Sequence, residues 1–262
     1  MHFSLLGVCW DKTQTYRKGA AKAPDAIRKV LPHLETWHAG IDLAETTFLK
    51  DLGNVKVPNF DMITNNIFAA LHSNAVPAGN IPIILGGDHS VTLAAVKALK
   101  PRKIVVFDAH PDAEDTHGHS GVVRRMAEIV GPQNIVLFGT RTLSKVEHEW
   151  LSQNRIQIAS LRDLRKIREP VYLSIDLDVL DPFVLPAVGN PEPVGLRFID
   201  VMEAINALAP NIAAMDFVEF TPTTCCTDVH ALTVGKLIYA AMADIVRAQT
   251  EQRRINSVFS KA

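Results

Sequence analysis

Residues 103–112 read KIVVFDAHPD, an apolar run that ends in two carboxylates and an imidazole. The run 103–107 is short and rich in β-branched and aromatic side chains, which predicts a buried strand. Apolar runs that end in polar side chains recur in IPIILGGDHS at 81–90 and in VYLSIDLD at 171–178. Continuously apolar strands are typical of a parallel sheet covered on both faces, so these three segments predict such a sheet.

The alternation of apolar runs with segments of helical period continues along the rest of the chain. Further strands are predicted at 3–8, 134–138 and 212–215, and helices at 26–31, 62–71, 92–99, 121–130, 199–208 and 232–247. Strands and helices in turn are typical of the α/β class. No repeat or Gly/Ser-rich linker divides the 262 residues, and the Pro-rich stretch 182–193 follows a strand directly, as an ordered loop would. We therefore expect a single domain over residues 1–262.

The charge and cysteine content exclude several classes of protein. The 27 basic and 28 acidic residues give a net charge of −1, without the one-signed excess that binding to nucleic acid or anionic membranes needs. The amino-terminal residues lack a signal-peptide pattern, and the apolar runs are shorter than the roughly 20 residues that span a bilayer. The three cysteines, Cys9, Cys225 and Cys226, are too few for a disulfide framework. We expect a cytoplasmic protein with neither nucleic acid nor a membrane as a partner.

Three polar clusters, at 86–90, 108–112 and 176–178, follow three of the predicted strands. Ligands bind at the carboxyl ends of the strands in parallel sheets, so the clusters can meet in one crevice. Residues two apart in extended chain point to the same side, which aligns Asp108 with His110, and Asp176 with Asp178. The resulting group has four carboxylates and two imidazoles: His89, Asp108, His110, Asp112, Asp176 and Asp178.

Four carboxylates packed together would repel one another and, once buried, would take up protons unless cations neutralised them. Two divalent ions would cancel the four charges. Oxygen and imidazole ligands without a thiolate suit Mn²⁺, Mg²⁺, Fe²⁺, Co²⁺, Ni²⁺ or Zn²⁺, and a pair of such ions can activate a water for hydrolysis. A lone Asp or His at a strand end more often forms a turn or caps a helix, which is the alternative for Asp88. Three clusters at three strand ends favour the paired-metal site.

Taken together, the motifs resemble those of the ureohydrolases, the family of arginase, agmatinase and formiminoglutamase. The matching segments are GGDHS at 86–90, DAHPD at 108–112, SIDLDVLDP at 174–182, GNPEPVGL at 189–196 and MDFVEFTP at 215–222. Residues 10–28 resemble the amino-terminal signature of agmatinases in particular, so the resemblance covers essentially the whole chain. It implies a three-layer α/β/α sandwich with a mostly parallel eight-stranded sheet, two Mn²⁺ ions per subunit, and assembly into homotrimers or homohexamers.

The resemblance also implies a role for each residue that matches a family motif. His89 and Asp112 would bind one metal ion, His110 and Asp178 the other, and Asp108 and Asp176 would bridge the two. Glu219 would bind the substrate guanidinium, Asp112 would accept a proton from the attacking water, and His119 would help to protonate the departing amine. His117 lies two residues from His119 and is an alternative for that last role.

Departures from the arginase pattern bear on the substrate. Glu114, followed by Asp115, stands where arginases carry an asparagine that contacts the substrate carboxylate, and Ser144 replaces the aspartate that binds the α-amino group. Acidic side chains repel a carboxylate and attract a cation, so Glu114 is expected to bind the tail of a small cationic guanidino substrate. A solvated acidic loop would explain the same two residues. We expect the substrate to be agmatine, which would be hydrolysed to urea and putrescine. The alternative substrates are arginine, guanidinobutyrate, aminopropylagmatine and formiminoglutamate.

Two other kinds of protein fit the sequence less well. A deacetylase with a single zinc ion would need two adjacent histidines, and none of the ten histidines is adjacent to another. A non-catalytic family member would have lost metal ligands, whereas this chain keeps all six. Cys225 and Cys226 replace the Asp-Pro-Ser-Gly that agmatinases usually carry after the Glu219 motif, and either inert buried thiols or a redox-sensitive pair would fit them.

Overall fold

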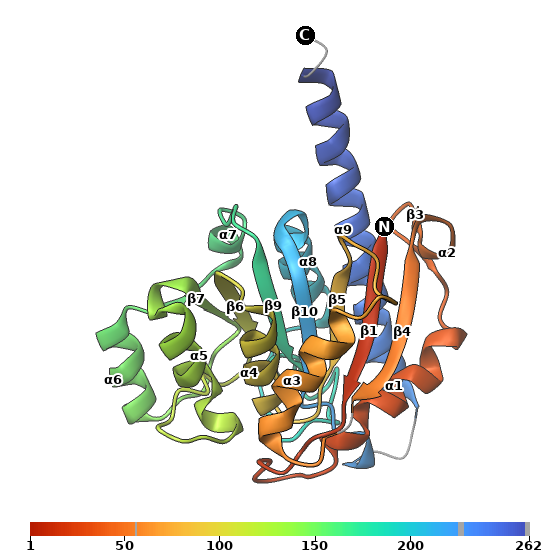
Figure 1. Ribbon diagram of the computed structural model, residues 1–262. Helices are drawn as coiled ribbons and strands as arrows, with labels where there is room; N and C mark the ends of the chain where they lie inside the picture. Colours follow the sequence, from red (N-terminus) through yellow and green to blue (C-terminus); the bar gives the residue numbers. More distant parts are fainter. Residues whose placement is uncertain (56, 225–227, 260–262) are drawn as a thin grey trace.

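The centre of the protein is an eight-stranded sheet in which the strands pair in parallel (Figure 1). The computed structural model describes residues 1–55, 57–224 and 228–259. The strands lie in the order β4-β1-β5-β10-β9-β6-β7-β8. Their bounds are β1 (His2–Val8), β4 (Phe48–Val55), β5 (Ile81–Leu85), β6 (Lys103–Phe107), β7 (Ile135–Phe138), β8 (Gln157–Ile158), β9 (Val171–Asp176) and β10 (Ile212–Val218). The expected α/β fold with an eight-stranded sheet is confirmed.

Helices cover both faces of this sheet, which gives three layers (Figure 1). One face carries α3 (Phe60–Leu71), α4 (Ser90–Leu99), α5 (Val122–Val130) and α6 (Lys145–Asn154). The other carries α1 (Ala23–Val30), α7 (Leu161–Leu164), α8 (Phe198–Leu208) and α9 (Val229–Phe259), with α2 (Leu43–Thr46) and the hairpin of β2 (Trp37–His38) and β3 (Ile41–Asp42) beside α9. Short 3-10 turns are η1 (Ala20–Lys22), η2 (Leu31–His33), η3 (His119–Gly121), η4 (Pro132–Asn134), η5 (Leu177–Val179), η6 (Ala209–Asn211) and η7 (Pro222–Thr224).

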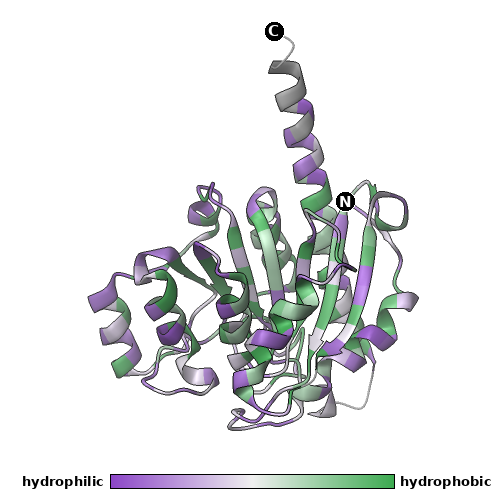
Figure 2. Ribbon diagram, viewed as in Figure 1, coloured by the Kyte–Doolittle hydropathy of each residue, from purple (hydrophilic) through white to green (hydrophobic). Residues whose placement is uncertain are grey.

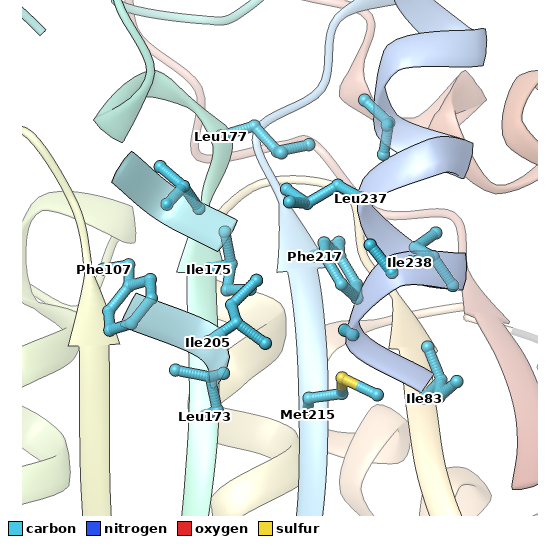
Figure 3. Close-up of a cluster of buried hydrophobic side chains, with 14 of the residues drawn as sticks. Ile83, Phe107, Leu173, Ile175, Leu177, Ile205, Met215, Phe217, Leu237 and Ile238 are labelled. Carbon is cyan, nitrogen blue, oxygen red and sulfur yellow. The ribbon is translucent and has the colours of Figure 1, made fainter. Parts of the chain in front are cut away.

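The core consists of two apolar clusters, one on each face of the sheet. Alternate residues of a strand point to opposite faces, so Val105 and Phe107 pack toward α8 and α9 while Ile104 and Val106 pack toward α4 and α5. Figure 3 shows the cluster on the face covered by α8 and α9, where Phe217 lies against α9. In Figure 2 the central strands are coloured mainly as hydrophobic, and the covering helices carry both colours. Burial on both faces explains why the central strands are continuously apolar in sequence.

Helix α9 is the longest helix and its first half belongs to the core. Within it, the side chains of Val234, Leu237, Ile238 and Ile245 are fully buried. Among the described residues, only Val229–Gln252 is long and apolar enough to cross a membrane, and 67% of its apolar window is buried inside the protein. Because this segment packs against the sheet, we interpret it as a core helix. The final turns of α9 project beyond the rest of the protein (Figure 1).

The last two long strands of the chain occupy the middle of the sheet. β10 and β9 lie between β5 and β6, although β6 follows β5 along the chain with only α4 between them. The register pairs Asp216 of β10 with Ser174 of β9, and Phe107 of β6 with Ile175 of β9. The carboxyl ends of these four strands therefore lie next to one another at one edge of the sheet.

Candidate metal centre and active site

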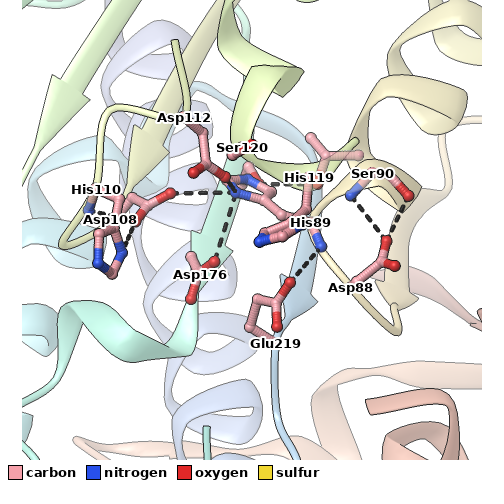
Figure 4. Close-up of polar contacts among 12 residues, drawn as sticks. Asp88, His89, Ser90, Asp108, His110, Asp112, His119, Ser120, Asp176 and Glu219 are labelled. Atoms are coloured by element: carbon pink, nitrogen blue, oxygen red, sulfur yellow. Dashed lines mark hydrogen bonds and ion pairs between the residues drawn. The ribbon is translucent and has the colours of Figure 1, made fainter. Parts of the chain in front are cut away.

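All six predicted ligand residues lie together at the carboxyl edge of the sheet. Figure 4 shows His89, Asp108, His110, Asp112 and Asp176 among them. His89 lies directly before α4, in the loop that follows β5. Asp108, His110 and Asp112 follow β6. Asp176 ends β9 and Asp178 lies in η5 just beyond it. The three sequence clusters converge because their strands are close neighbours in a parallel sheet.

Four of these side chains surround one point. His89 Nδ1 lies 2.8 Å from Asp112 Oδ2, 3.1 Å from Asp108 Oδ2 and 3.5 Å from Asp176 Oδ2. All four residues are buried, and their ligand atoms lie within 4.8 Å of one another. This first group therefore offers an imidazole nitrogen and three carboxylates to a single ion.

A second group adjoins the first and shares Asp108 with it. His110 Nδ1 lies 2.9 Å from Asp178 Oδ2 and 3.6 Å from Asp108 Oδ1. The two oxygens of Asp108 thus face different imidazoles, as those of a carboxylate between two ions would. Asp176 has ligand atoms in the first group only, and its Oδ1 accepts a hydrogen bond of 2.9 Å from the backbone N–H of Asp178.

Burial and mutual repulsion shift the protonation of the cluster. Burial, reinforced by the charge of Asp108, raises the pKa of Asp112 to about 7. Burial, reinforced by Asp178, raises the pKa of Asp176 well above its ordinary value. Burial by itself would lower the pKa of His110, but hydrogen bonds to Asp108 and Asp178 outweigh it and raise that pKa to about 11. Without a cation the cluster binds protons, which divalent ions would displace.

The residues fit a pair of divalent ions. Asp108 Oδ2 is buried inside the cluster and accepts no hydrogen bond, so it is an acceptor without a donor. Among the described residues, both groups consist of carboxylates and imidazoles without a thiolate. Such ligands suit Mn²⁺ and similar ions and do not suit an iron–sulfur cluster.

Glu219 closes one side of the cluster, and its contacts were not predicted from the sequence. The carboxylate is buried, with Oε1 accepting from the backbone N–H of His89 at 2.8 Å and Oε2 accepting from Gln14 Nε2 at 2.7 Å. Burial, reinforced by Asp88, raises the pKa of Glu219 to about 8. Gly189 leaves the space for this arrangement, because a Cβ there would lie 2.6 Å from Glu219 Oε2.

A cavity of about 380 Å³ opens over the cluster, and only one of the two histidines proposed to protonate the amine lines it. His119 lines it and is buried, its Nδ1 has no hydrogen-bond partner, and its backbone N–H donates to Thr13 Oγ1 at 3.1 Å. His117 is exposed and does not line the cavity. A larger cavity of about 910 Å³ lies at the opposite edge of the sheet, and no residue of the cluster lines it. The smaller cavity is therefore the candidate substrate pocket.

The acidic residues near this cavity differ in their surroundings. Asp115 forms ion pairs with Arg124 and Arg125, so its charge is compensated. Glu114 is exposed and lines the cavity. Glu147, which the sequence did not single out, also lines the cavity but is buried: it accepts hydrogen bonds from the backbone N–H groups of Ala113 and Ser144, at 3.1 and 2.8 Å. Ser144, at the cavity wall, caps α6 with its Oγ, which accepts from the backbone N–H of Glu147 at 3.2 Å.

Asp88 has a structural role beside the cluster. Asp88 lies at the start of α4, where its carboxylate accepts from the backbone N–H of Ser90 at 3.1 Å and of Thr13 at 2.8 Å. It therefore fixes the turn and the amino-terminal segment and belongs to neither metal-binding group. Cys225 and Cys226 lie outside the described residues.

Comparison with known proteins places the fold and site in a family. The arginase family model matches residues 1–243. An N(1)-aminopropylagmatine ureohydrolase of Thermococcus kodakarensis is 36% identical over 267 residues, which cover 94% of this chain and 91% of that protein. An agmatinase of Pyrococcus horikoshii is 33% identical and covers 90% and 89%. The solved structure of an agmatine ureohydrolase of Thermoplasma volcanium has a TM-score of 0.85 and 30% identity, covering 95% of this chain and 91% of that one.

The fold and the site together define a metal-dependent hydrolase that acts on C–N bonds of guanidino compounds. The chain belongs to the arginase family. The resemblance of its sequence motifs to those of the ureohydrolases is thereby confirmed, and the buried His/Asp cluster lies where those motifs meet.

Proposed function

We propose that this protein is a dimanganese ureohydrolase that converts agmatine to putrescine and urea. The observation that carries the proposal is the buried cluster of His and Asp residues in which Asp108 belongs to both metal-binding groups. The printed names of the agmatinase relatives support the choice of reaction. We also propose a homotrimer or homohexamer, as the family resemblance implies, and a cytoplasmic location, which the low cysteine content supports.

Six residues would hold the two ions. His89 and Asp112 would hold one and His110 and Asp178 the other, with Asp108 shared between the two groups. Asp176, whose ligand atoms lie in the first group, would be the second shared carboxylate that the family resemblance implies. When bound, the ions supply an activated water near neutral pH and offset the negative charge that develops during attack. The chain itself supplies the geometry, since the ligand atoms of each group already lie within 4.8 Å of one another.

Glu219 would bind the substrate guanidinium. Each of its oxygens accepts one hydrogen bond from the protein, and each carboxylate oxygen has a second lone pair for a guanidinium N–H. Because Gln14 and the backbone of His89 fix the carboxylate, the cation would be held in one orientation beside the cluster. A fixed orientation of this kind is what attack on the guanidino carbon needs.

Asp112 and His119 would handle the protons of the attacking water. In the reaction the water oxygen bonds to the guanidino carbon, the C–N bond to the amine breaks, and both water protons end on the amine nitrogen, which leaves as an ammonium beside neutral urea. Asp112 faces the cluster and would accept a water proton first. Burial lowers the pKa of His119, so its imidazole is neutral near pH 7 and can carry a proton to the leaving amine.

The cavity supports a substrate with a cationic tail. Glu114 and Glu147 line its wall, and acidic side chains favour an amine over a carboxylate. We therefore propose agmatine before arginine, guanidinobutyrate or formiminoglutamate. N(1)-aminopropylagmatine is the second candidate, because a relative with that name is 36% identical to this chain.

Product release from a set of substrates tests the proposal. Protein loaded with Mn²⁺ is given agmatine, N(1)-aminopropylagmatine, arginine and guanidinobutyrate with urea as the readout, and formiminoglutamate with formamide as the readout. We expect urea chiefly from agmatine, and a loss of at least about 100-fold with His110→Ala, since losing a ligand removes an ion that stabilises the transition state. His148→Ala, an exposed histidine on α6, is the control and should keep full activity. No product from any of the five compounds would refute the proposal.

A further inference from the structure

A buried carboxylate that belongs to neither metal-binding group lies behind the cluster. Asp216 is in the centre of β10, next to Ser174 of β9 in the sheet register. The side chain is fully buried, as are those of Ser174 and Thr92. Burying a carboxylate inside the sheet costs free energy unless hydrogen bonds compensate it. Such a residue is therefore a candidate for a functional role.

Hydrogen bonds connect this carboxylate to His89. Tyr172 Oη donates to Asp216 Oδ2 at 2.5 Å, and Ser174 Oγ donates to Asp216 Oδ1 at 2.7 Å. His89 Nε2 lies 3.2 Å from Ser174 Oγ, and Thr92 Oγ1 lies 3.1 Å from the same oxygen. The path from Asp216 to the imidazole therefore has a single intermediate, the hydroxyl of Ser174.

The chemistry of the groups fixes the direction of each bond. An ionised carboxylate only accepts, so the hydrogen of Ser174 points to Asp216 and both lone pairs of its oxygen remain for donors. One lone pair faces His89 Nε2 and the other faces Thr92. Nε2 must then carry a hydrogen, which leaves Nδ1 as the ligand nitrogen. Nδ1 is the atom that lies 2.8 Å from Asp112 and 3.1 Å from Asp108.

We propose that Asp216, acting through Ser174, is a positioning residue that holds His89 in the tautomer and orientation needed to bind a divalent ion. Hydrogen bonding of the second ring nitrogen to a carboxylate typically strengthens metal binding by a histidine. Asp216 itself contacts no ligand atom of the cluster in this arrangement. The inference rests on the proposed metal centre, and it does not depend on which guanidino compound is the substrate.

The test is Mn²⁺ binding by Asp216→Asn, which keeps the size of the side chain. An amide has one acceptor and one donor group, so one of the two hydroxyls that donate to Asp216 must turn away. If Ser174 turns, it donates to His89 Nε2 and moves the imidazole hydrogen to Nδ1. We expect Mn²⁺ to bind the His89 group about 10- to 100-fold more weakly. Metal analysis at buffered free Mn²⁺ should then find one ion retained, and the electron paramagnetic resonance spectrum should change from that of a coupled pair to that of isolated Mn²⁺.

Two further variants separate positioning from general stability. Asp244→Asn makes the same change at a buried carboxylate of α9 that is paired with Arg247, and it should keep two coupled ions. Ser174→Ala removes the intermediate hydroxyl and should reproduce the weaker binding, and it decides the question if Asp216→Asn does not fold. Two ions bound with wild-type affinity by a folded Ser174→Ala protein would overturn this inference and leave the proposed function standing. A wild-type protein that binds no Mn²⁺ would overturn both.

Discussion

Asp112 and Glu219 both have left-handed backbone conformations, with φ of 44° and 64°. Such conformations cost non-glycine residues of order 1 kcal/mol each and persist only where the surroundings impose them. The surroundings here are hydrogen bonds of 2.9 Å from Val123 N–H to the carbonyl of Asp112, and of 2.8 Å from Glu219 N–H to the carbonyl of Gly87. Backbone strain at two residues beside the same cluster is typical of an active site.

Gly189 determines where the Glu219 carboxylate lies. A Cβ at position 189 would lie 2.6 Å from Glu219 Oε2 and 2.9 Å from Gln14 Nε2, so Gly189→Ala must displace one of them. We expect urea release to fall about 100-fold, because a displacement of about 1 Å at a positioning group has an effect of this size. The bound manganese should not change, since Gly189 contacts no predicted ligand. Steady-state kinetics and metal analysis of the same sample check this, and undiminished activity would argue against substrate binding at Glu219.

At this scale the sequence reveals residues with a local signature and misses those without one. The six predicted ligands stand out because polar side chains end apolar runs. Gln14 is missed because its partner Glu219 is 205 residues away and nothing near Gln14 marks it as polar and buried. Asp216 did carry a signal, since it interrupts the apolar run AAMDFV, and a charge inside a central strand needs compensating partners.

At the scale of elements, the sequence predicts those that are buried on two faces. The predicted strands at 81–85 and 103–107 agree with β5 and β6 to the residue. β4 is missed because it forms one edge of the sheet, and its half-exposed sequence FLKDLGNV has no clean alternation. α6 is missed because its sequence KVEHEWLSQN buries only two side chains. Edge elements have little apolar surface to bury, so their sequences carry a weak pattern.

Helix α9 should contribute to stability through its buried side chains alone. Leu237 is fully buried against the sheet, whereas Val229 on the same helix is 60% exposed. We expect Leu237→Ala to lower the free energy of unfolding by about 2–5 kcal/mol, the range for a buried Leu that leaves a cavity. Val229→Ala should change it by less than about 0.5 kcal/mol. Denaturant unfolding of both variants measures the difference, and equal effects would show that the packing of α9 is not as described.

At the scale of the whole molecule, the site makes the stability of the metal-free protein depend on pH. Burial raises the pKa of Asp112 from 3.8 to about 7 and that of Glu219 from 4.5 to about 8. The folded state therefore binds protons more tightly than the unfolded state. The resulting stability is present below the ordinary pKa values and is lost as pH rises through the raised ones. His110, with a pKa raised to about 11, acts in the same direction.

We accordingly expect metal-free protein to unfold at a lower denaturant concentration at about pH 8.5 than at about pH 5.5. Added Mn²⁺ should reverse the trend, because it binds the deprotonated ligands and its stabilising effect grows with pH. Denaturant unfolding at both pH values, with chelator or with Mn²⁺, measures how the free energy of unfolding changes with pH in each state. A metal-free protein that is more stable at the higher pH would contradict the shifts at the cluster.

The position of β9 and β10 between β5 and β6 has a consequence for biosynthesis. A nascent chain that has left the ribosome only as far as residue 170 contains β5 and β6 but neither of the strands that later separate them. Both strands then present an open edge of unpaired N–H and C=O groups, which favours wrong pairing between them or with other chains. The newly made protein therefore depends on its final third to close the sheet, and until that third emerges both open edges are exposed to wrong pairing.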